Sequence, residues 1–83
     1  MRAVTYRPSA VKALRRMPRD QAELVRSKVR QYAADPASLA NNVTELKGRP
    51  GLRLRVGNWR VILEEDATVV DVQDIGPRGG IYG

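Results

Sequence analysis

The 83-residue sequence predicts an α+β fold, in which a helical hairpin precedes an antiparallel sheet. In the first half, apolar residues recur every three or four positions, which is the spacing of one helix face; after residue 51 they alternate with polar residues, as in a strand. A chain of this length has room for one modest core, so we expect a single domain over residues 1–83. We therefore predict an antiparallel sheet of about four strands, with the N-terminal helical hairpin packed on one face.

The first half contains one short strand and two helices. Residues 3–6 have the composition of an opening strand, and Ser9, placed before a run of helically spaced apolar residues, is the expected N-cap of the first helix. A proline then ends this helix. Asp20 and Glu23 have the spacing of a capping box, which predicts the start of a second helix that ends before Pro36.

The second half predicts a loop followed by strands. Residues 37–51 are rich in Gly, Pro and Asn and are expected to form a loop, with a brief extended piece over 43–46. Residues 52–63 alternate with period two on both sides of Gly57-Asn58, which suits a two-residue type II′ turn because glycine accepts the positive φ of its first position. Residues 69–75 supply the last strand.

Charge and composition limit the possible functions. Fifteen Lys and Arg against nine Asp and Glu give a formal charge of +6, and most of the cations are arginine, the residue suited to bidentate phosphate contacts. This composition favours an anionic partner. The absence of Cys and His excludes thiol nucleophiles, histidine-based triads and ribonuclease pairs, and thiolate or histidine metal sites. We expect no metal, no cofactor and no membrane association, and a cytoplasmic location, because no apolar run resembles a signal or membrane-spanning segment.

The predicted turn fixes a register that gathers arginines on one face of the sheet. Arg55 faces Arg60 across the hairpin, and Arg53 lies on the same face, opposite the helices. Like charges placed directly across two strands destabilise a sheet by up to about 1 kcal/mol, so we interpret the pair as functional rather than as an ordinary solvated face. The positive field is expected to include Arg15, Arg16, Lys47, Arg49 and Arg78, although Arg15 and Arg16 also fit an ordinary solvated helix face.

The remaining conspicuous side chains have structural interpretations. Trp59 and Tyr32 fall on the apolar phase of their elements and are predicted to lie in the core rather than to stack on bases. Glu64, Glu65 and Asp66 are predicted to solvate a turn and the end of a strand.

The chain resembles the RelE/ParE superfamily of type II toxin-antitoxin toxins over nearly its whole length. The segment 9–18, SAVKALRRMP, resembles the first helix of that family, and Leu46-Lys-Gly48 followed by residues 53–62, RLRVGNWRVI, resembles its sheet signature. The ending over 75–82, IGPRGGIY, is similar to the C-terminal strand and tail of the RelE branch. This resemblance implies the microbial ribonuclease-type fold of RelE, and we prefer the RelE-like branch because Arg78 and Tyr82 are both present.

The resemblance implies an activity and a set of residues. RelE-like members cut mRNA in the ribosomal A site without a metal, by attack of the ribose 2′-oxygen on the adjacent phosphorus. Carried over by position, the catalytic residues are Arg55, Arg60, Arg78 and Tyr82, and Arg53 is an RNA-binding residue. Lys47 and Arg49, which add to the basic field, are the other expected RNA-binding residues. Arginine replaces the lysine that this branch often has in the sheet, and no residue matches the histidine that some relatives use.

Two alternatives remain open from the sequence. ParE-like members inhibit DNA gyrase without nuclease chemistry, and an inactive relative would only bind its antitoxin. The partners implied by the resemblance are a cognate antitoxin, the ribosome and mRNA. A toxin-antitoxin hetero-oligomer that binds operator DNA through the antitoxin is a further expectation.

Overall fold

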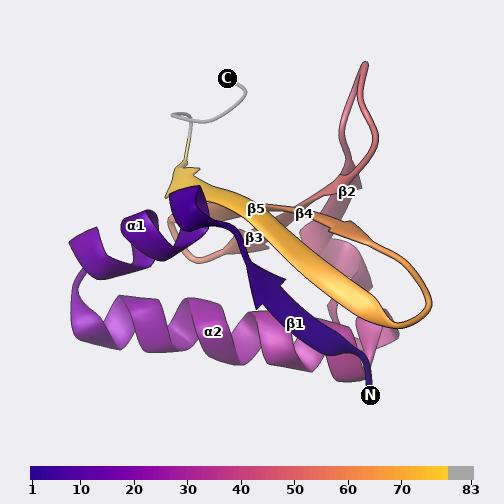
Figure 1. Ribbon diagram of the computed structural model, residues 1–83, viewed down its shortest axis with the longest axis horizontal. Helices are drawn as coiled ribbons and strands as arrows, with labels where there is room; N and C mark the ends of the chain where they lie inside the picture. Colours follow the sequence, from indigo (N-terminus) through magenta and orange to yellow (C-terminus); the bar gives the residue numbers. More distant parts are fainter. Residues whose placement is uncertain (79–83) are drawn as a thin grey trace.

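The computed structural model describes residues 1–78, which form a five-stranded sheet with its helices on one side (Figure 1). The order of the strands in the sheet is β1-β5-β4-β3-β2. The elements are β1 (Ala3–Tyr6), α1 (Pro8–Arg16), α2 (Arg19–Ala34), the 3₁₀ segment η1 (Pro36–Asn42), β2 (Val43–Glu45), β3 (Leu52–Val56), β4 (Trp59–Glu65) and β5 (Val69–Pro77). No helix within this part of the chain is long and apolar enough to cross a membrane.

The predicted fold class is confirmed, and the sheet differs from the prediction in two details. The brief extended piece after η1 pairs with β3 and becomes a fifth strand, β2. The first strand also pairs in parallel with the last, from Ala3 opposite Val69 to Tyr6 opposite Val72, whereas the other pairs are antiparallel. Parallel neighbours need a long connection, and here nearly the whole chain lies between β1 and β5.

The predicted N-cap of the first helix is wrong. Helix α1 begins at Pro8, and Arg7, its N-cap residue, forms no side-chain capping bond. Proline suits the first helical position because it has no amide hydrogen that needs a partner and because its φ is already helical. The Ser9 hydroxyl is therefore free for a tertiary contact, and it donates to Asp74 Oδ1 at 2.8 Å.

The predicted capping box of the second helix is also wrong. Helix α2 begins at Arg19, with Pro18 as its N-cap residue, so Asp20 lies inside the first turn and makes no side-chain capping bond. There its carboxylate still opposes the positive end of the helix dipole. Glu23 instead accepts from Arg26 at 3.1 Å on the helix surface.

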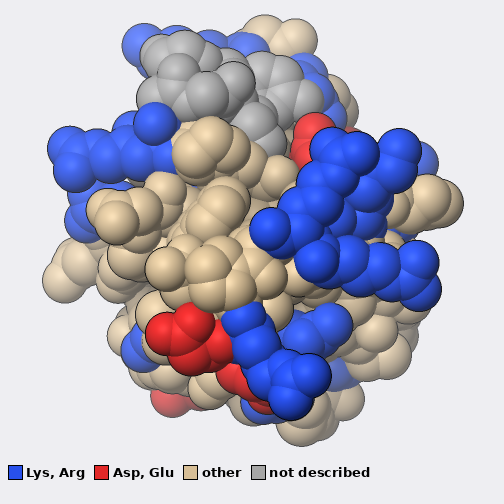
Figure 2. Space-filling model, turned by 90° about the vertical axis from the view of Figure 1, so that its left-hand side faces the viewer, with Lys and Arg blue, Asp and Glu red and all other residues tan. Residues whose placement is uncertain are grey.

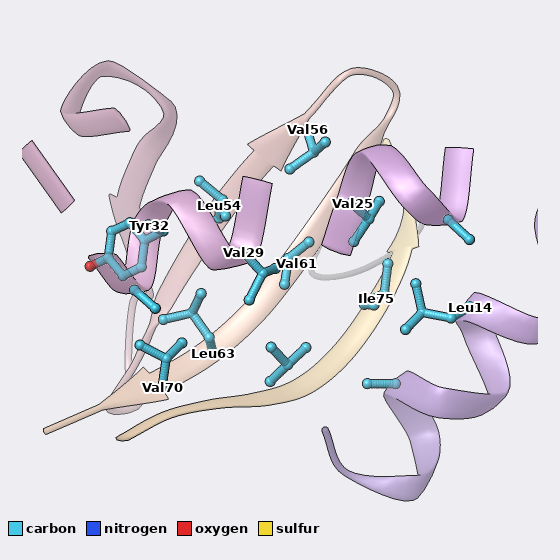
Figure 3. Close-up of a cluster of buried hydrophobic side chains, with 14 of the residues drawn as sticks. Leu14, Val25, Val29, Tyr32, Leu54, Val56, Val61, Leu63, Val70 and Ile75 are labelled. Carbon is cyan, nitrogen blue, oxygen red and sulfur yellow. The ribbon is translucent and has the colours of Figure 1, made fainter. Parts of the chain in front are cut away.

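The core lies between the helices and the inner face of the sheet (Figure 3). Leu54, Val61 and Leu63 of the sheet meet Val25 and Val29 of α2, and all five are fully buried. Tyr32 is buried among them and Trp59 packs half-buried at the margin, as predicted for both aromatic residues. The alternation read from the sequence therefore separates the core face of the hairpin from its arginine face.

The turn between β3 and β4 has the predicted register. Val56 lies opposite Trp59, and Arg55 opposite Arg60. Gly57 has a φ of +56°, the left-handed conformation that its position was expected to require. A second glycine, Gly51 at the start of β3, has a φ of +120°.

We expect Gly51→Ala to destabilise the fold more than Gly57→Ala. Both alanines would incur the steric cost of positive φ, about 1–2 kcal/mol. At Gly51 the new Cβ would also lie 2.9 Å from the Leu63 carbonyl oxygen, a backbone atom in the middle of β4, whereas at Gly57 it would meet nothing within 4 Å. Thermal unfolding of the two variants checks the order. Asn58→Ser, which leaves both glycines in place, is the control. Equal midpoints for Gly51→Ala and Gly57→Ala would contradict it.

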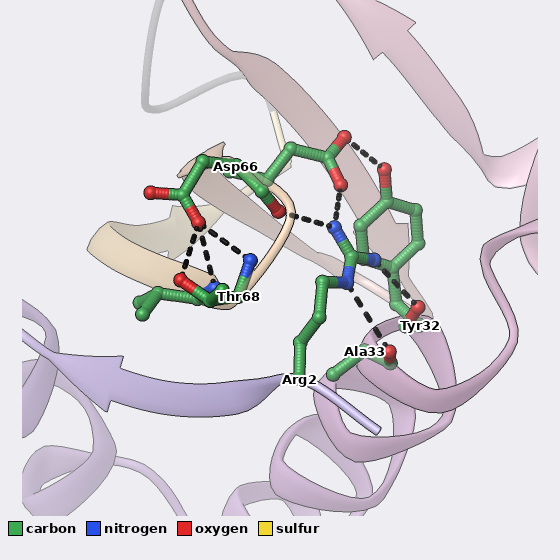
Figure 4. Close-up of polar contacts among 7 residues, drawn as sticks. Arg2, Tyr32, Ala33, Asp66 and Thr68 are labelled. Carbon is green, nitrogen blue, oxygen red and sulfur yellow. Dashed lines mark hydrogen bonds and ion pairs between the residues drawn. The ribbon is translucent and has the colours of Figure 1, made fainter.

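Arg2 ties the N-terminus to the end of α2 and to the β4-β5 turn (Figure 4). Its guanidinium donates to Glu65 Oε1 and to the carbonyl oxygens of Tyr32, Ala33 and Asp66, each carbonyl at 3.3 Å. The Tyr32 hydroxyl donates to the other oxygen of Glu65 at 2.5 Å. The prediction that Glu65 only solvates a strand end is therefore wrong, because its carboxylate joins two elements that are distant in sequence.

The contacts among Arg2, Tyr32 and Glu65 make the protein's stability vary with pH in the acid range. Burial acts to raise the pKa of Glu65, but the hydrogen bonds from Tyr32 and Arg2 outweigh it, so the pKa falls below its ordinary value of 4.5. A carboxyl group with a lowered folded-state pKa stabilises the fold above its unfolded-state pKa, and that contribution is lost as the pH falls through the folded-state pKa. Burial, followed by the bond to Glu65, raises the pKa of Tyr32 to about 12.

We expect Glu65→Gln to flatten the acid limb of the stability curve. The amide can still accept a hydrogen bond but has no charge to lose, so its thermal midpoint should fall less than that of the wild type between about pH 6 and pH 3. Thermal unfolding monitored by circular dichroism across this range measures the difference. Parallel curves for the two proteins would show that Glu65 does not titrate with folding.

Candidate nucleic-acid interface

Three arginines lie on the sheet face that the helices leave uncovered. Arg53 of β3 lies opposite Ile62, and Arg55 lies opposite Arg60 of β4, so alternation along the two strands places all three on one face. With residues of η1 and β2 they line a pocket of about 70 Å³, which we call the arginine pocket. Its lining residues are Asn41, Asn42, Thr44, Arg53, Arg55 and Arg60.

The polar residues that line the arginine pocket were not predicted from the sequence. Asn41 and Asn42 end η1, and Thr44 pairs with Arg53 across β2 and β3. Asn42 Nδ2 also approaches the Arg55 carbonyl oxygen at 3.5 Å, which attaches this segment to the strand. Asn41 and Asn42 directly precede β2, which pairs with the arginine-bearing strand β3. Their position next to this predicted extended segment is the sequence signal that could have identified them.

No carboxylate within residues 1–78 neutralises the charges of the arginine pocket. Among residues 1–78, Arg53, Arg55 and Arg60 form no ion pair, in contrast to Arg2 and Arg7, which bind Glu65 and Asp71 elsewhere. A volume of about 70 Å³ is roughly that of two water molecules, which is on the order of one phosphate group. Guanidinium groups bind phosphate oxygens through paired, charge-assisted hydrogen bonds. The arginine pocket therefore has the size and charge of a phosphate site.

Arg78 lies at the same end of the sheet as the β3-β4 turn. Its backbone N–H donates to the Asn58 carbonyl oxygen at 2.7 Å, directly after the end of β5. Gly76 lies opposite Arg60, and Arg78 follows the last residue of β5, Pro77. The side chain is exposed and does not line the arginine pocket. Tyr82, the other predicted C-terminal site residue, lies outside the described residues.

Lys47 and Arg49 are separated from the arginine pocket. Both lie in the loop between β2 and β3, at the end of the sheet away from Gly57. Arg49 Nη2 donates to Gln73 Oε1 at 2.9 Å, and Arg49 borders a larger pocket of about 470 Å³ that is also lined by Glu45. The predicted site is thus divided into a compact trio of arginines, Arg78 beside the turn, and two cations at the far end of the sheet.

The chain's sequence matches the model of the family described as the ParE toxin of type II toxin-antitoxin systems, over residues 4–82. The chain belongs to this toxin family. The assignment to the RelE/ParE superfamily made from its motifs is therefore confirmed. No curated protein sequence matches the toxin.

Solved structures show that RelE proteins share the fold of this toxin. The archaeal RelE-RelB complex from Pyrococcus horikoshii OT3 contains a chain with 24% sequence identity and a TM-score of 0.78, and the match covers 95% of this toxin and 97% of that chain. A chain of the RelBE toxin-antitoxin complex from E. coli has 18% identity and a TM-score of 0.75, with 93% and 96% covered. YafQ from E. coli has 11% identity and a TM-score of 0.67, with both chains fully covered.

Proposed function

We propose that this toxin binds mRNA on the ribosome and cleaves it by attack of a ribose 2′-oxygen on the adjacent phosphorus. The observation that carries the proposal is the convergence of Arg53, Arg55 and Arg60, without carboxylate partners in the described chain, on a pocket of phosphate size. An RNA strand would place its scissile phosphate there, and the asparagines and Thr44 would offer hydrogen bonds to its oxygens or to the ribose.

The arginine pocket would act mainly through electrostatics. Attack on phosphorus develops negative charge on the phosphorane oxygens, and fixed cations stabilise that charge without reorganising. Arg55 and Arg60, which face each other across the hairpin, would hold the phosphate from two sides, and Arg53 would position the strand for in-line attack. Their mutual repulsion in the unliganded sheet is relieved when an anion lies between them.

The proton transfers are assigned to the C-terminal part of the chain. Arg78, beside the β3-β4 turn, would neutralise or protonate the leaving 5′-oxygen, and Tyr82, in its phenolate form, would accept the proton of the 2′-hydroxyl. Lys47 and Arg49 lie in the β2-β3 loop and do not line the arginine pocket, and they are proposed as contacts to flanking RNA phosphates.

A cognate antitoxin is the expected protein partner. The formal charge of +6 and the unpaired arginines of the sheet suit an acidic segment that covers the arginine pocket and blocks RNA. RelE chains of the same fold have been solved in complex with RelB. We propose that this toxin likewise assembles with an antitoxin, in a hetero-oligomer that binds operator DNA through the antitoxin.

Inhibition of DNA gyrase is the second candidate function. The described lining of the arginine pocket consists of arginines, asparagines and a threonine, and none of these side chain types exchanges protons readily near neutral pH. Inhibition through protein binding needs no proton carrier, so this lining suits it equally well.

Induction of the toxin in a susceptible bacterium, with parallel labelling of protein and DNA synthesis, tests the proposal. We expect an early collapse of protein synthesis for the wild type and for Arg30→Ala, which removes an exposed cation from α2. We expect no collapse for the double variant Arg55→Ala/Arg60→Ala. DNA breaks with an SOS response would favour gyrase instead, and normal growth with the wild type would indicate a relative that only binds its antitoxin.

A further inference from the structure

The turn between α1 and α2 carries three exposed arginines that the proposed chemistry does not use. Arg15 and Arg16 end α1 and Arg19 begins α2; we call these three residues the turn cluster. Within residues 1–78 none of their guanidinium groups forms an ion pair or a hydrogen bond. The sequence has no Asp or Glu before Asp20, so the turn cluster keeps a net positive charge.

The turn cluster lies at the same end of the molecule as the β3-β4 turn. The Trp59 indole N–H donates to Gln21 Oε1 at 2.8 Å, which joins the beginning of α2 to the beginning of β4. Trp59 directly precedes Arg60, and Arg19 lies two residues before Gln21. Figure 1 shows both turns on the left of the molecule. Figure 2 looks onto this end and shows Lys and Arg side chains in separate groups on either side of a band of uncharged atoms, with smaller patches of Asp and Glu beside them.

Four carboxylates gather at the opposite end, whereas Asp20 and Glu23 lie on α2 close to the turn cluster. Glu64, Glu65, Asp66 and Asp71 line one pocket of about 240 Å³ around the β4-β5 turn. Near the turn cluster, Asp20 lies in the first turn of α2. This separation of charge would orient the protein in the field of a polyanion, with the turn cluster and the β3-β4 turn facing it.

We propose that the turn cluster binds the phosphate backbone of structured RNA, next to the RNA strand held in the arginine pocket. This inference rests on the proposed function in one respect: a toxin that cleaves mRNA on the ribosome would meet ribosomal RNA as the structured RNA. The turn cluster consists of arginines only, and guanidinium groups are suited to binding phosphate oxygens. The exposed large apolar residues of the described chain, Met1 and Leu24, lie outside the turn cluster, whereas a protein interface is built around apolar or aromatic anchors.

The test compares two double variants that each remove two cations without a carboxylate partner in the described chain. Arg16→Ala/Arg19→Ala removes two of the three arginines of the turn cluster. Lys28→Ala/Arg30→Ala also removes two positive charges, but from further along α2. Binding of the purified toxin to 70S ribosomes is measured over a range of salt concentrations. We expect the first variant to lose roughly tenfold in affinity, with the salt slope reduced by about two, and the second to stay close to the wild type. Arg16→Lys/Arg19→Lys should keep most of the affinity, since it keeps the charge.

The outcomes separate this inference from the proposed function. An equal loss of ribosome affinity in the two alanine variants would overturn the inference, and so would a turn-cluster variant that binds ribosomes normally but no longer binds the antitoxin. A raised KM with an unchanged kcat for mRNA cleavage supports both proposals. If the wild type cuts no mRNA, yet the turn-cluster variant still loses ribosome affinity, the proposed cleavage fails and the RNA-binding surface stands.

Discussion

Arg60→Ala is expected to slow single-turnover cleavage of mRNA on programmed ribosomes by roughly 10²-fold or more. The Arg60 side chain is half-buried in the arginine pocket, opposite Arg55, so it is held where charge would develop on the phosphorane. The loss of one preorganised donor to a transition-state oxyanion has an effect of this size. Ribosome affinity should fall much less, because many other cations contribute to binding a polyanion and each accounts for about one unit of salt slope.

Arg30→Ala is the matched control for Arg60→Ala. Arg30 is exposed on α2, on the other side of the sheet from the arginine pocket, and it forms no ion pair among the described residues. Cleavage by this variant should equal that of the wild type. If Arg60→Ala and Arg78→Ala both cut at the wild-type rate, the assignment of the active site is wrong.

Leu63→Ala is expected to cost about 2–5 kcal/mol of folding stability, the range for truncating a fully buried leucine. Leu63 lies in the middle of β4 with no exposed surface, and Figure 3 shows it between the sheet and α2. For a domain of this size the thermal midpoint should fall by more than about 10 °C.

Leu24→Ala makes the same change at a leucine that is 45% exposed, and it should shift stability by no more than about 0.5 kcal/mol. Thermal unfolding by circular dichroism compares the two variants directly. Similar midpoints would mean that the core is not centred on β4 as described.

The sequence predicted those parts of the fold that depend on local periodicity. Alternation along residues 52–63 and one glycine at positive φ were sufficient to place Arg53, Arg55 and Arg60 on one face, because the pleat and the turn together determine the register. The helix starts were mispredicted because polar caps were expected at Ser9 and Asp20, whereas α1 begins one residue earlier, at Pro8, and α2 begins at Arg19, directly after Pro18. Proline suits a helix start without a side-chain cap.

Contacts between distant segments could not be predicted in this way. Arg2, Tyr32 and Glu65 come from the N-terminus, α2 and β4, and no periodic pattern indicates that they meet. The same holds for Asn41, which lines the arginine pocket only because β2 joins the sheet beside β3. The parallel pairing of β1 with β5 depends likewise on a long connection, which strand composition does not report.

The place of β5 in the sheet affects when the toxin can become active during its own synthesis. β5 lies between β1 and β4, so the first strand of the chain has no neighbour until residues 69–77 have been translated. A contact that joins the two ends of a chain forms late, because closing so long a loop costs entropy before any pairing repays it. A nascent chain that has not yet released residues 69–77 from the ribosome therefore lacks the completed sheet, and the toxin gains its fold only after β5 has emerged. A cell that makes this protein thus has at least the time needed to translate residues 1–77 in which an antitoxin can be ready to meet it.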